Sequence, residues 1–190
     1  TLSVMFPMVS EPWEFDEAQA LFEAQRAWLA SRGKKLPNEV RYGAMLEVPA
    51  LAEVLDGARL ILKERLARVA VRWPTLPPGL MVVAGRVRLE QVVVNILQNA
   101  VEALDGQPAP AITISLDDQG ECVVLTIADT GPGIAPDIAE RLFTPFATSR
   151  PTGLGLGLTI AQDIMHDLGG SLRLVPSAQG AAFAIAMRRA

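Results

Sequence analysis

The spacing of apolar residues predicts most elements of this 190-residue chain. Between Arg86 and Leu104, apolar residues recur every three or four positions, which is typical of a helix with one buried face. Cys122–Ala128 is an alternating apolar run and predicts a strand. Because a polar turn precedes it, we expect a hairpin with Ala111–Leu116. A second hairpin is expected to pair Ser171–Val175 with Ala182–Met187.

Shorter elements are expected around these. A helix from Ala50 to Val69 has an apolar stripe at three- and four-residue spacing. The other expected strands and helices are Arg68–Trp73, Leu80–Ala84, Pro136–Leu142 and Leu154–Leu168.

The first fifty residues have a pattern of their own. An apolar strand and loop is followed by an amphipathic helix, Pro12–Ala30, and by a second strand, Val40–Val48. This order predicts one parallel β-α-β unit. A lone unit leaves apolar faces exposed, so we expect its strands to pair with each other and to extend the sheet of the remaining chain.

Composition narrows the functional classes. Half of the residues are apolar, and the length suits one domain or one domain with an appendage. A formal charge of −4 argues against non-specific nucleic-acid binding. Cys122 is the only cysteine, which argues against a disulfide framework and a thiolate metal site. We find no uncharged apolar run of membrane-spanning length and no secretion signal, so we expect a cytoplasmic location.

The carboxylate of Asp129 is the first candidate for chemistry. It opens the sequence Asp-Thr-Gly-Pro-Gly-Ile directly after the strand 122–128. A buried carboxylate needs a hydrogen-bond donor, and the exocyclic amino group of adenine offers one. Gly131 and Gly133 let the backbone turn sharply and approach a flat ring. The alternative is an ordinary Asp-Gly turn between a strand and a helix.

A glycine-leucine repeat at the start of an apolar helix is the second candidate. The repeat consists of Gly153, Leu154, Gly155, Leu156, Gly157 and Leu158. Backbone N–H groups at a helix start can bind phosphate when no side chain obstructs them. The leucines are expected to point into the core and anchor the loop. The alternative is a flexible linker, but linkers favour Ser and Thr over Leu.

Two asparagines in the helix 86–104 form the third candidate. Asn95 and Asn99 are four residues apart and share one face, and Glu102 follows three residues later. Among so many apolar residues the asparagines need polar partners. Their oxygens beside a carboxylate, with phosphate oxygens opposite, suit Mg²⁺. The alternative is that both are solvated at the helix surface.

The order of these motifs resembles one family. The asparagine helix, DTGPGI, the FTPF of residues 143–146 and GLGLGL are similar to the N, G1, F and G2 boxes of the ATP-binding domain of sensor histidine kinases. That domain has the Bergerat, or GHKL, fold. The resemblance covers about Val48–Ala190, and QNAVEAL is similar to the nitrogen-regulation and dicarboxylate-sensing branch. It implies an α/β (α+β) two-layer sandwich that binds ATP and Mg²⁺.

The resemblance implies roles on the adenine side of the site. Asp129 would bind the adenine amino group, and the glycines after it would shape the turn. Ile134 would line the face of the ring. Phe143 and Phe146 would pack at the hinge of the loop that covers the nucleotide.

It also implies roles on the phosphate side. Asn99, with Asn95 beside it, would hold Mg²⁺ against the phosphates, and Glu102 would lie next to them. The glycine repeat and Thr148 would contact the nucleotide. Arg150 would stabilise the charge of the transferring phosphoryl group.

Three positions depart from the patterns of related proteins. Related kinases usually have an aspartate where Gly85 stands, so a helix cap is expected to be missing. They often have a threonine near Ala181 or Ala182, so one contact near the adenine is expected to be missing. Related ATPases that hydrolyse ATP have a glutamate where Asn95 stands, which predicts very slow hydrolysis.

The N-terminal segment resembles another family. LSVMFPMVSE and YGAMLEVPAL are similar to the phosphoenolpyruvate-binding, TIM-barrel-like domain of phosphotransferase-system phosphotransferases, in which the glutamate matching Glu47 helps hold Mg²⁺. The rest of that barrel does not follow in this sequence, and a barrel closes only with eight strands, so phosphoenolpyruvate chemistry is not expected. We predict a chimera with a β-α-β barrel-like fragment at residues 1–50 and an ATP-binding catalytic domain at residues 51–190.

The expected function is that of the catalytic domain of a two-component sensor histidine kinase. His166 is the only histidine and lacks the phosphoacceptor pattern of that family. The phosphoacceptor domain and the response regulator are therefore expected as partners outside this chain, which would be monomeric without the dimerisation helices. The alternatives are a chimeric scaffold that retains at most nucleotide binding, and a hydrolysing ATPase or serine kinase of the same superfold.

Overall fold

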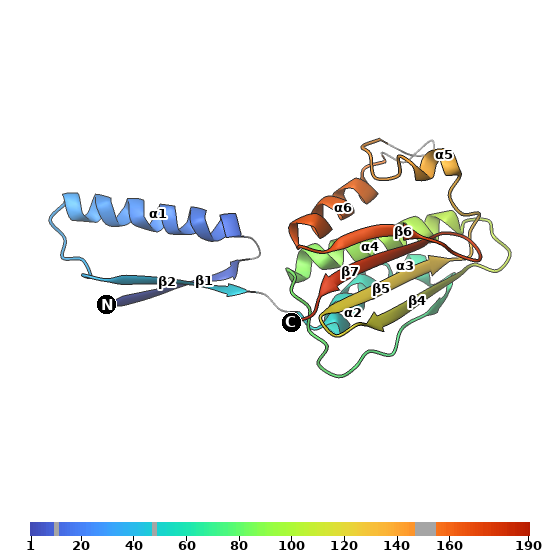
Figure 1. Cartoon of the computed structure of the whole chain (residues 1–190), viewed down its shortest axis with the longest axis horizontal. Coiled ribbons are helices and arrows are strands. Elements are labelled where there is room, and N and C mark those ends of the chain that lie inside the picture. Colours follow the sequence, from blue (N-terminus) through green and yellow to red (C-terminus); the bar gives the residue numbers. More distant parts are fainter. Residues whose placement is uncertain (10–11, 47–48, 147–154) are drawn as a thin grey trace. The chain divides into compact units, whose positions relative to one another are not determined.

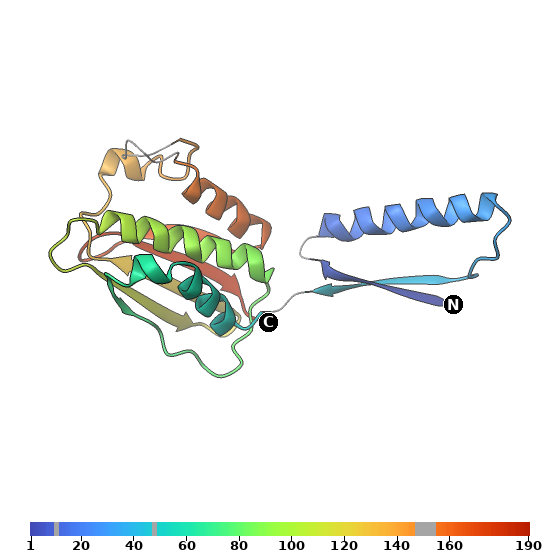
Figure 2. The ribbon, with the colours of Figure 1, turned by 180° about the vertical axis from the view of Figure 1, so that it is seen from behind.

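The computed structural model describes residues 1–9, 12–46, 49–146 and 155–190. The chain divides into two compact units, Thr1–Glu47 and Val48–Ala190 (Figures 1 and 2). None of the helices in the described ranges is long and apolar enough to cross a bilayer.

The first unit is the predicted parallel β-α-β unit. Strands β1 (Leu2–Val9) and β2 (Val40–Leu46) pair in parallel, and helix α1 (Pro12–Ser31) connects them and lies over one face of their sheet (Figure 1). Within this unit the two strands pair with each other, as expected, and form a two-stranded sheet.

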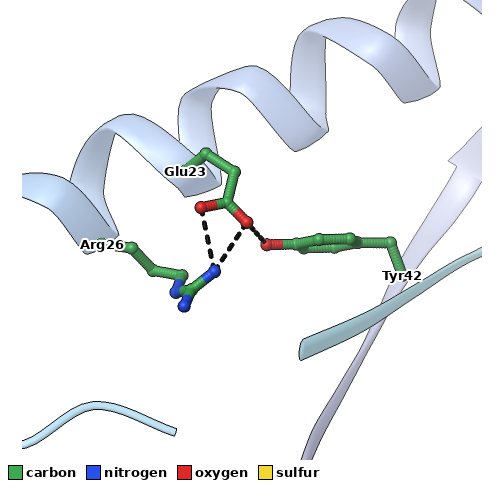
Figure 3. Close-up of polar contacts among 3 residues, drawn as sticks. All are labelled: Glu23, Arg26 and Tyr42. Atoms are coloured by element: carbon green, nitrogen blue, oxygen red, sulfur yellow. Dashed lines mark hydrogen bonds and ion pairs between the residues drawn. The ribbon is translucent and has the colours of Figure 1, made fainter. Parts of the chain in front are cut away.

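Aromatic rings join α1 to this sheet. Phe6 stacks on Tyr42 with 6.1 Å between ring centroids and meets Phe15 of α1 edge-on at 5.8 Å. The Tyr42 hydroxyl donates a hydrogen bond to Glu23, whose carboxylate also pairs with Arg26 at 2.8 Å (Figure 3). The bond from Tyr42 is the largest cause that lowers the pKa of Glu23 from its ordinary value. Desolvation, followed by the bond to Glu23, raises the pKa of Tyr42.

The second unit is a two-layer α+β sandwich. Its strands are β3 (Ala70–Arg72), β4 (Ala111–Asp118), β5 (Cys122–Asp129), β6 (Ser171–Val175) and β7 (Ala182–Arg188). Its helices are α2 (Leu51–Ile61), α3 (Lys63–Leu66), α4 (Arg86–Ala103), α5 (Pro136–Ala139) and α6 (Gly157–Asp167). The strand order is β3-β4-β5-β7-β6, and α2, α4 and α6 cover one face of the sheet (Figures 1 and 2). Both predicted hairpins are confirmed, because β4 pairs antiparallel with β5 and β6 with β7.

The facing apolar sides of the two layers form the core. Val123, Leu125 and Ile127 are the buried apolar residues of β5, and α4 packs across this strand between α2 and α6 (Figure 2). Each fully buried apolar side chain contributes about 1.5–3 kcal/mol. This packing stabilises α4, which begins after Gly85 without a side-chain cap.

The predicted strand Leu80–Ala84 is wrong. Its burial does alternate, with Val82 buried and Met81 exposed. However, the segment pairs only through single bridges, from Met81 to Ala50 and from Val82 to Arg189. It also meets the end of β7: the Val83 N–H donates to the carbonyl oxygen of Arg188 at 3.0 Å, and the Ala190 N–H donates to that of Met81 at 3.1 Å.

The predicted helix Ala50–Val69 is divided into α2 and α3 at Leu62, where the backbone has φ −97° and ψ 12°. Buried residues repeat every four positions here, through Ala58, Leu62 and Leu66. A four-residue repeat drifts about 40° per step around an α-helix, so a straight helix would turn Leu66 away from the core. The break at Leu62 corrects this drift.

Candidate functional site

Asp129 is the last residue of β5 and is only 5% exposed although its side chain is ionisable. Its Oδ1 accepts hydrogen bonds from the N–H of Gly131 at 2.8 Å and of Ala181 at 3.3 Å. The first bond is that of a local Asx turn, but the second comes from a residue 52 positions away. These backbone donors offset the desolvation of the carboxylate and favour one orientation of it.

The turn after Asp129 lies against the C-terminal end of α4. A Cβ atom at Gly131 would be 2.8 Å from Oδ1 of Asp129 and 3.1 Å from the carbonyl oxygen of Ala103, so a side chain has no room there. Gly133 has a φ of +78°, in the left-handed region that favours glycine. The predicted glycine turn is therefore positioned by α4 as well as by β5.

One face of α4 connects this turn with the start of α6. Asn95, Asn99 and Ala103 lie at four-residue intervals on that face. The side-chain nitrogen Nδ2 of Asn95 donates a hydrogen bond to the carbonyl oxygen of Gly157, the first residue of α6, at 3.1 Å. Ala103 lies against Gly131, so Asn99 is between the two glycine segments, about 6 Å along the helix from either neighbour.

The segment between the Asp129 turn and α6 contains the two predicted phenylalanines. Phe143 is half-buried against the core, and its carbonyl oxygen accepts a hydrogen bond from the Thr159 hydroxyl at 3.3 Å. Phe146 is 72% exposed and has a φ of +66°, which is uncommon for a residue other than glycine. Its N–H donates to the carbonyl oxygen of Gly155 at 3.1 Å, and Gly155 also has a positive φ, +64°.

The leucines of the repeat differ in position. Leu158 packs against the core, as predicted, and Leu156 is half-buried directly before α6. Four predicted site residues lie outside the described residues: Thr148, Arg150, Gly153 and Leu154.

Two other predicted residues have contacts of their own. Ile134 is partly buried and packs against the core. Glu102 is exposed, and its carboxylate contacts Arg65 of α3 at 3.4 Å and Gln98 at 3.0 Å. The contact with Arg65 joins Glu102 to α3, whereas Asn95 contacts the start of α6. No group of three His, Cys, Asp or Glu side chains gathers as a metal site in the part of the chain that the structure describes.

Sequence patterns did not identify Gly180, the backbone of Ala181, or Thr130 as parts of this site. The hydroxyl oxygen of Thr130 accepts a hydrogen bond from the Ala111 N–H at 3.0 Å, which ties the turn to β4. Gly180 has a φ of +68° and lies against Asp129. The available signals were a single glycine shortly before an apolar strand, and the resemblance, which placed the side chain at Ala181 or Ala182 near the adenine.

Relatives with similar sequences include bacterial sensor proteins. The C4-dicarboxylate transport sensor protein DctB of Rhizobium meliloti is 43% identical over 143 residues, which are 74% of this chain and 23% of that protein. The C4-dicarboxylate transport sensor protein DctS of Rhodobacter capsulatus is 36% identical over 68% of this chain and 20% of its own length. The chain therefore spans less than a quarter of the length of either protein.

Similar solved structures include two histidine kinases. The catalytic domain of the histidine kinase ThkA is 28% identical with a TM-score of 0.68, over 76% of this chain and 98% of that chain. The mycobacterial sensor histidine kinase MprB is 28% identical with a TM-score of 0.67, over the same shares of the two chains. The fold predicted from the resemblance is confirmed.

Two families match different parts of the chain. Residues 1–61 match the PEP-binding domain of PEP-utilising enzymes, which confirms the resemblance of the first unit. Residues 84–190, more than half of the chain, match the family described as histidine kinase-, DNA gyrase B- and HSP90-like ATPase. This range contains Asp129, both asparagines and the start of α6. The chain belongs to the histidine kinase-, DNA gyrase B- and HSP90-like ATPase family.

Proposed function

We propose that residues 51–190 are the catalytic domain of a two-component sensor histidine kinase, which binds Mg-ATP and donates the γ-phosphoryl group to a histidine on another domain. The observation that carries this proposal is the buried carboxylate of Asp129 at the end of β5, beside the asparagine face of α4. Two similar solved structures are named as histidine kinases, one of them as a catalytic domain, which supports the same reaction.

Asp129 accepts the hydrogen bond of the adenine amino group in this proposal. Because Gly131 and Ala181 already hold its Oδ1, the carboxylate is ordered before the nucleotide binds, which lowers the entropic cost of binding. Gly131 and Gly133 let the backbone approach a flat ring, and Ile134 lines one face of that ring.

The phosphates lie between α4 and the start of α6 in this proposal. Backbone N–H groups of the glycine repeat and the positive end of the helix dipole bind them. Asn99 and Asn95 hold Mg²⁺ through their side-chain oxygens, as suits a hard cation. The bond from Asn95 to Gly157 uses the amide nitrogen, so it is compatible with a ligating oxygen on the same side chain. Mg²⁺ would neutralise phosphate charge there.

Positioning and charge stabilisation account for most of the catalysis of phosphoryl transfer. Arg150 is proposed to stabilise the charge that develops on the transferring group. An asparagine amide accepts no proton near neutral pH, so Asn95 cannot act as the general base for water. We therefore expect transfer to a histidine to be favoured over hydrolysis of ATP.

The partners in this proposal are the nucleotide, a phosphoacceptor domain and a response regulator, at the cytoplasmic side of a membrane-anchored parent. Residues 1–50 are proposed to be a barrel fragment without phosphoenolpyruvate chemistry; Glu47 lies outside the described residues. The match of residues 1–61 to a second family supports an alternative, a chimeric scaffold that binds nucleotide poorly.

Calorimetric titration of the whole chain with ADP and ATP in the presence of Mg²⁺ tests the proposal. We expect micromolar binding that is lost in Asp129→Ala, since this variant removes the only proposed partner of the adenine amino group. Asp117→Ala is the matched control because Asp117 lies at the other end of the same hairpin, in β4. A folded wild-type chain that binds neither nucleotide would favour the scaffold.

A further inference from the structure

The connection between β6 and β7 lies directly against the Asp129 turn. β7 pairs antiparallel with β5, and the last pair of this ladder is Ala128 with Ala182. Beyond it, the N–H of Asp129 donates to the carbonyl oxygen of Ala181 at 2.9 Å. The side-chain amide Nε2 of Gln179 donates to the carbonyl oxygen of Thr130 at 3.3 Å. Gln179–Ala181 therefore contacts the backbone on both sides of the Asp129 side chain.

Gly180 makes the closest approach in this connection. A Cβ atom at Gly180 would lie 2.5 Å from Oδ1 of Asp129 and 2.7 Å from its backbone carbon, and closer still to its carbonyl oxygen. Rotation of the Asp129 side chain cannot relieve this overlap, because two of the three atoms belong to the backbone. The φ of +68° at Gly180 also disfavours any other residue.

The same connection orients the carboxylate. Oδ1 of Asp129 lies between two backbone donors, Gly131 at 2.8 Å and Ala181 at 3.3 Å. A Cβ atom at Gly180 would lie 2.5 Å from this Oδ1, so a side chain there would crowd the atom that accepts the bond from Ala181. A displacement of the connection would lengthen this bond and allow the carboxylate to rotate.

We propose that Gly180 is a specificity-determining positioning residue, which lets the 179–181 connection aim the Asp129 carboxylate at the 6-amino group of adenine. This inference rests on the nucleotide site proposed above. A site built to accept a hydrogen bond rejects an analogue that lacks the donor, because its buried polar group is left unpaired. That discrimination requires a carboxylate in a fixed orientation, whereas general contacts to ribose and phosphates do not.

The test compares two ligands, ADP and purine riboside 5′-diphosphate, which has hydrogen in place of the 6-amino group. Calorimetric Kd values are measured with Mg²⁺ on the whole chain and on Gly180→Ala. We expect the preference for ADP to fall by about tenfold or more in the variant, the size of one lost hydrogen bond. Gly79→Ala is the matched control, since Gly79 has the same φ of +68° but nothing within 4 Å of its Cβ position. The control should keep the preference of the wild type.

A double variant shows whether Gly180 acts through Asp129. In an Asp129→Asn background, Gly180→Ala should leave the ADP preference unchanged, because the carboxylate that it displaces is gone. If Gly180→Ala does not fold, Gln179→Ala takes its place, since it removes only the bond to Thr130 and should reduce the preference by a smaller factor.

The outcomes separate this inference from the proposed function. Wild-type chain that binds neither ligand overturns the nucleotide site itself. Wild-type chain that prefers ADP, with a variant that weakens both ligands equally, overturns only the role of Gly180. If Gly180→Ala does not fold and Gln179→Ala keeps the ADP preference of the wild type, this result also overturns only the proposed role of Gly180 and its connection.

Discussion

Both units of this chain contain a long helix with regularly spaced apolar residues, but the two units bury these side chains to different degrees. Helix α1 of the first unit has apolar residues on two sides: Phe15 is partly buried, with an aromatic neighbour in β1, whereas Trp13 and Leu21 are 61% and 65% exposed. Helix α4 of the second unit has most of its apolar residues on one side, and Leu97 is fully buried there, although Val87 in its first turn is 77% exposed.

The difference follows from the number of layers and strands. A two-stranded sheet with one helix has too little surface to enclose a core, and it leaves an apolar face exposed. Five strands with α2, α4 and α6 enclose one continuous cluster. Polar contacts such as that of Tyr42 with Glu23 therefore matter more in the first unit, and apolar packing matters more in the second.

The largest expected effect comes from removing core packing in the second unit. Leu97→Ala should lower the free energy of unfolding by about 2–5 kcal/mol, because it leaves a cavity in the core where α4 packs. Leu21→Ala in α1 is the matched variant and should change it by less than about 0.5 kcal/mol. Urea denaturation followed by circular dichroism measures both. Equal losses would contradict the comparison.

A smaller effect is expected at the start of α4. Gly85 has φ −71° and ψ 124°, the extended conformation of a cap residue, and provides no side-chain cap. Gly85→Asp should raise the free energy of unfolding by about 0.5 kcal/mol, since its carboxylate can bond to free N–H groups and favours the positive end of the helix dipole. Gly85→Asn introduces a capping side chain without a charge, so it should give only part of the stabilisation expected for Gly85→Asp. A gain as large as the Leu97→Ala loss would show that packing is not what holds α4.

The smallest effect concerns the pH response of the first unit. Folding lowers the pKa of Glu23 from its ordinary value of 4.5, so its contribution to stability is present above that pH and is lost as the pH falls through the lower folded value. Tyr42→Phe removes the largest cause, and the pKa of Glu23 should rise toward 4.5. Arg26→Gln should raise it less. NMR titration of the side-chain carboxyl groups measures the pKa of Glu23 in the wild type and in both variants. An unchanged pKa of Glu23 in Tyr42→Phe would contradict a hydrogen bond between these two residues.

Periodicity was a good predictor where an element has one buried face. The hydrophobic pattern of α4 and the alternation in β5 identified these elements within a residue of their bounds. It failed at Leu80–Ala84, where burial alternates but the segment pairs only through single bridges, to Ala50 and to Arg189 just after β7. It also missed the break at Leu62, because a four-residue repeat satisfies a helical pattern locally and drifts only over several turns.

The periods of the helices and strands, the order of the motifs and the residue types that can bind a nucleotide can all be read from the order of the residues. Which backbone segments meet around Asp129 depends on how the chain folds. Ala181 is 52 positions away and contributes an N–H group, which every residue except proline has, so its type says nothing of this role. Gly180 is required because its backbone lies so close to Asp129 that a methyl group on its Cα would overlap with atoms of Asp129. Such a close approach of two distant segments is a property of the folded chain.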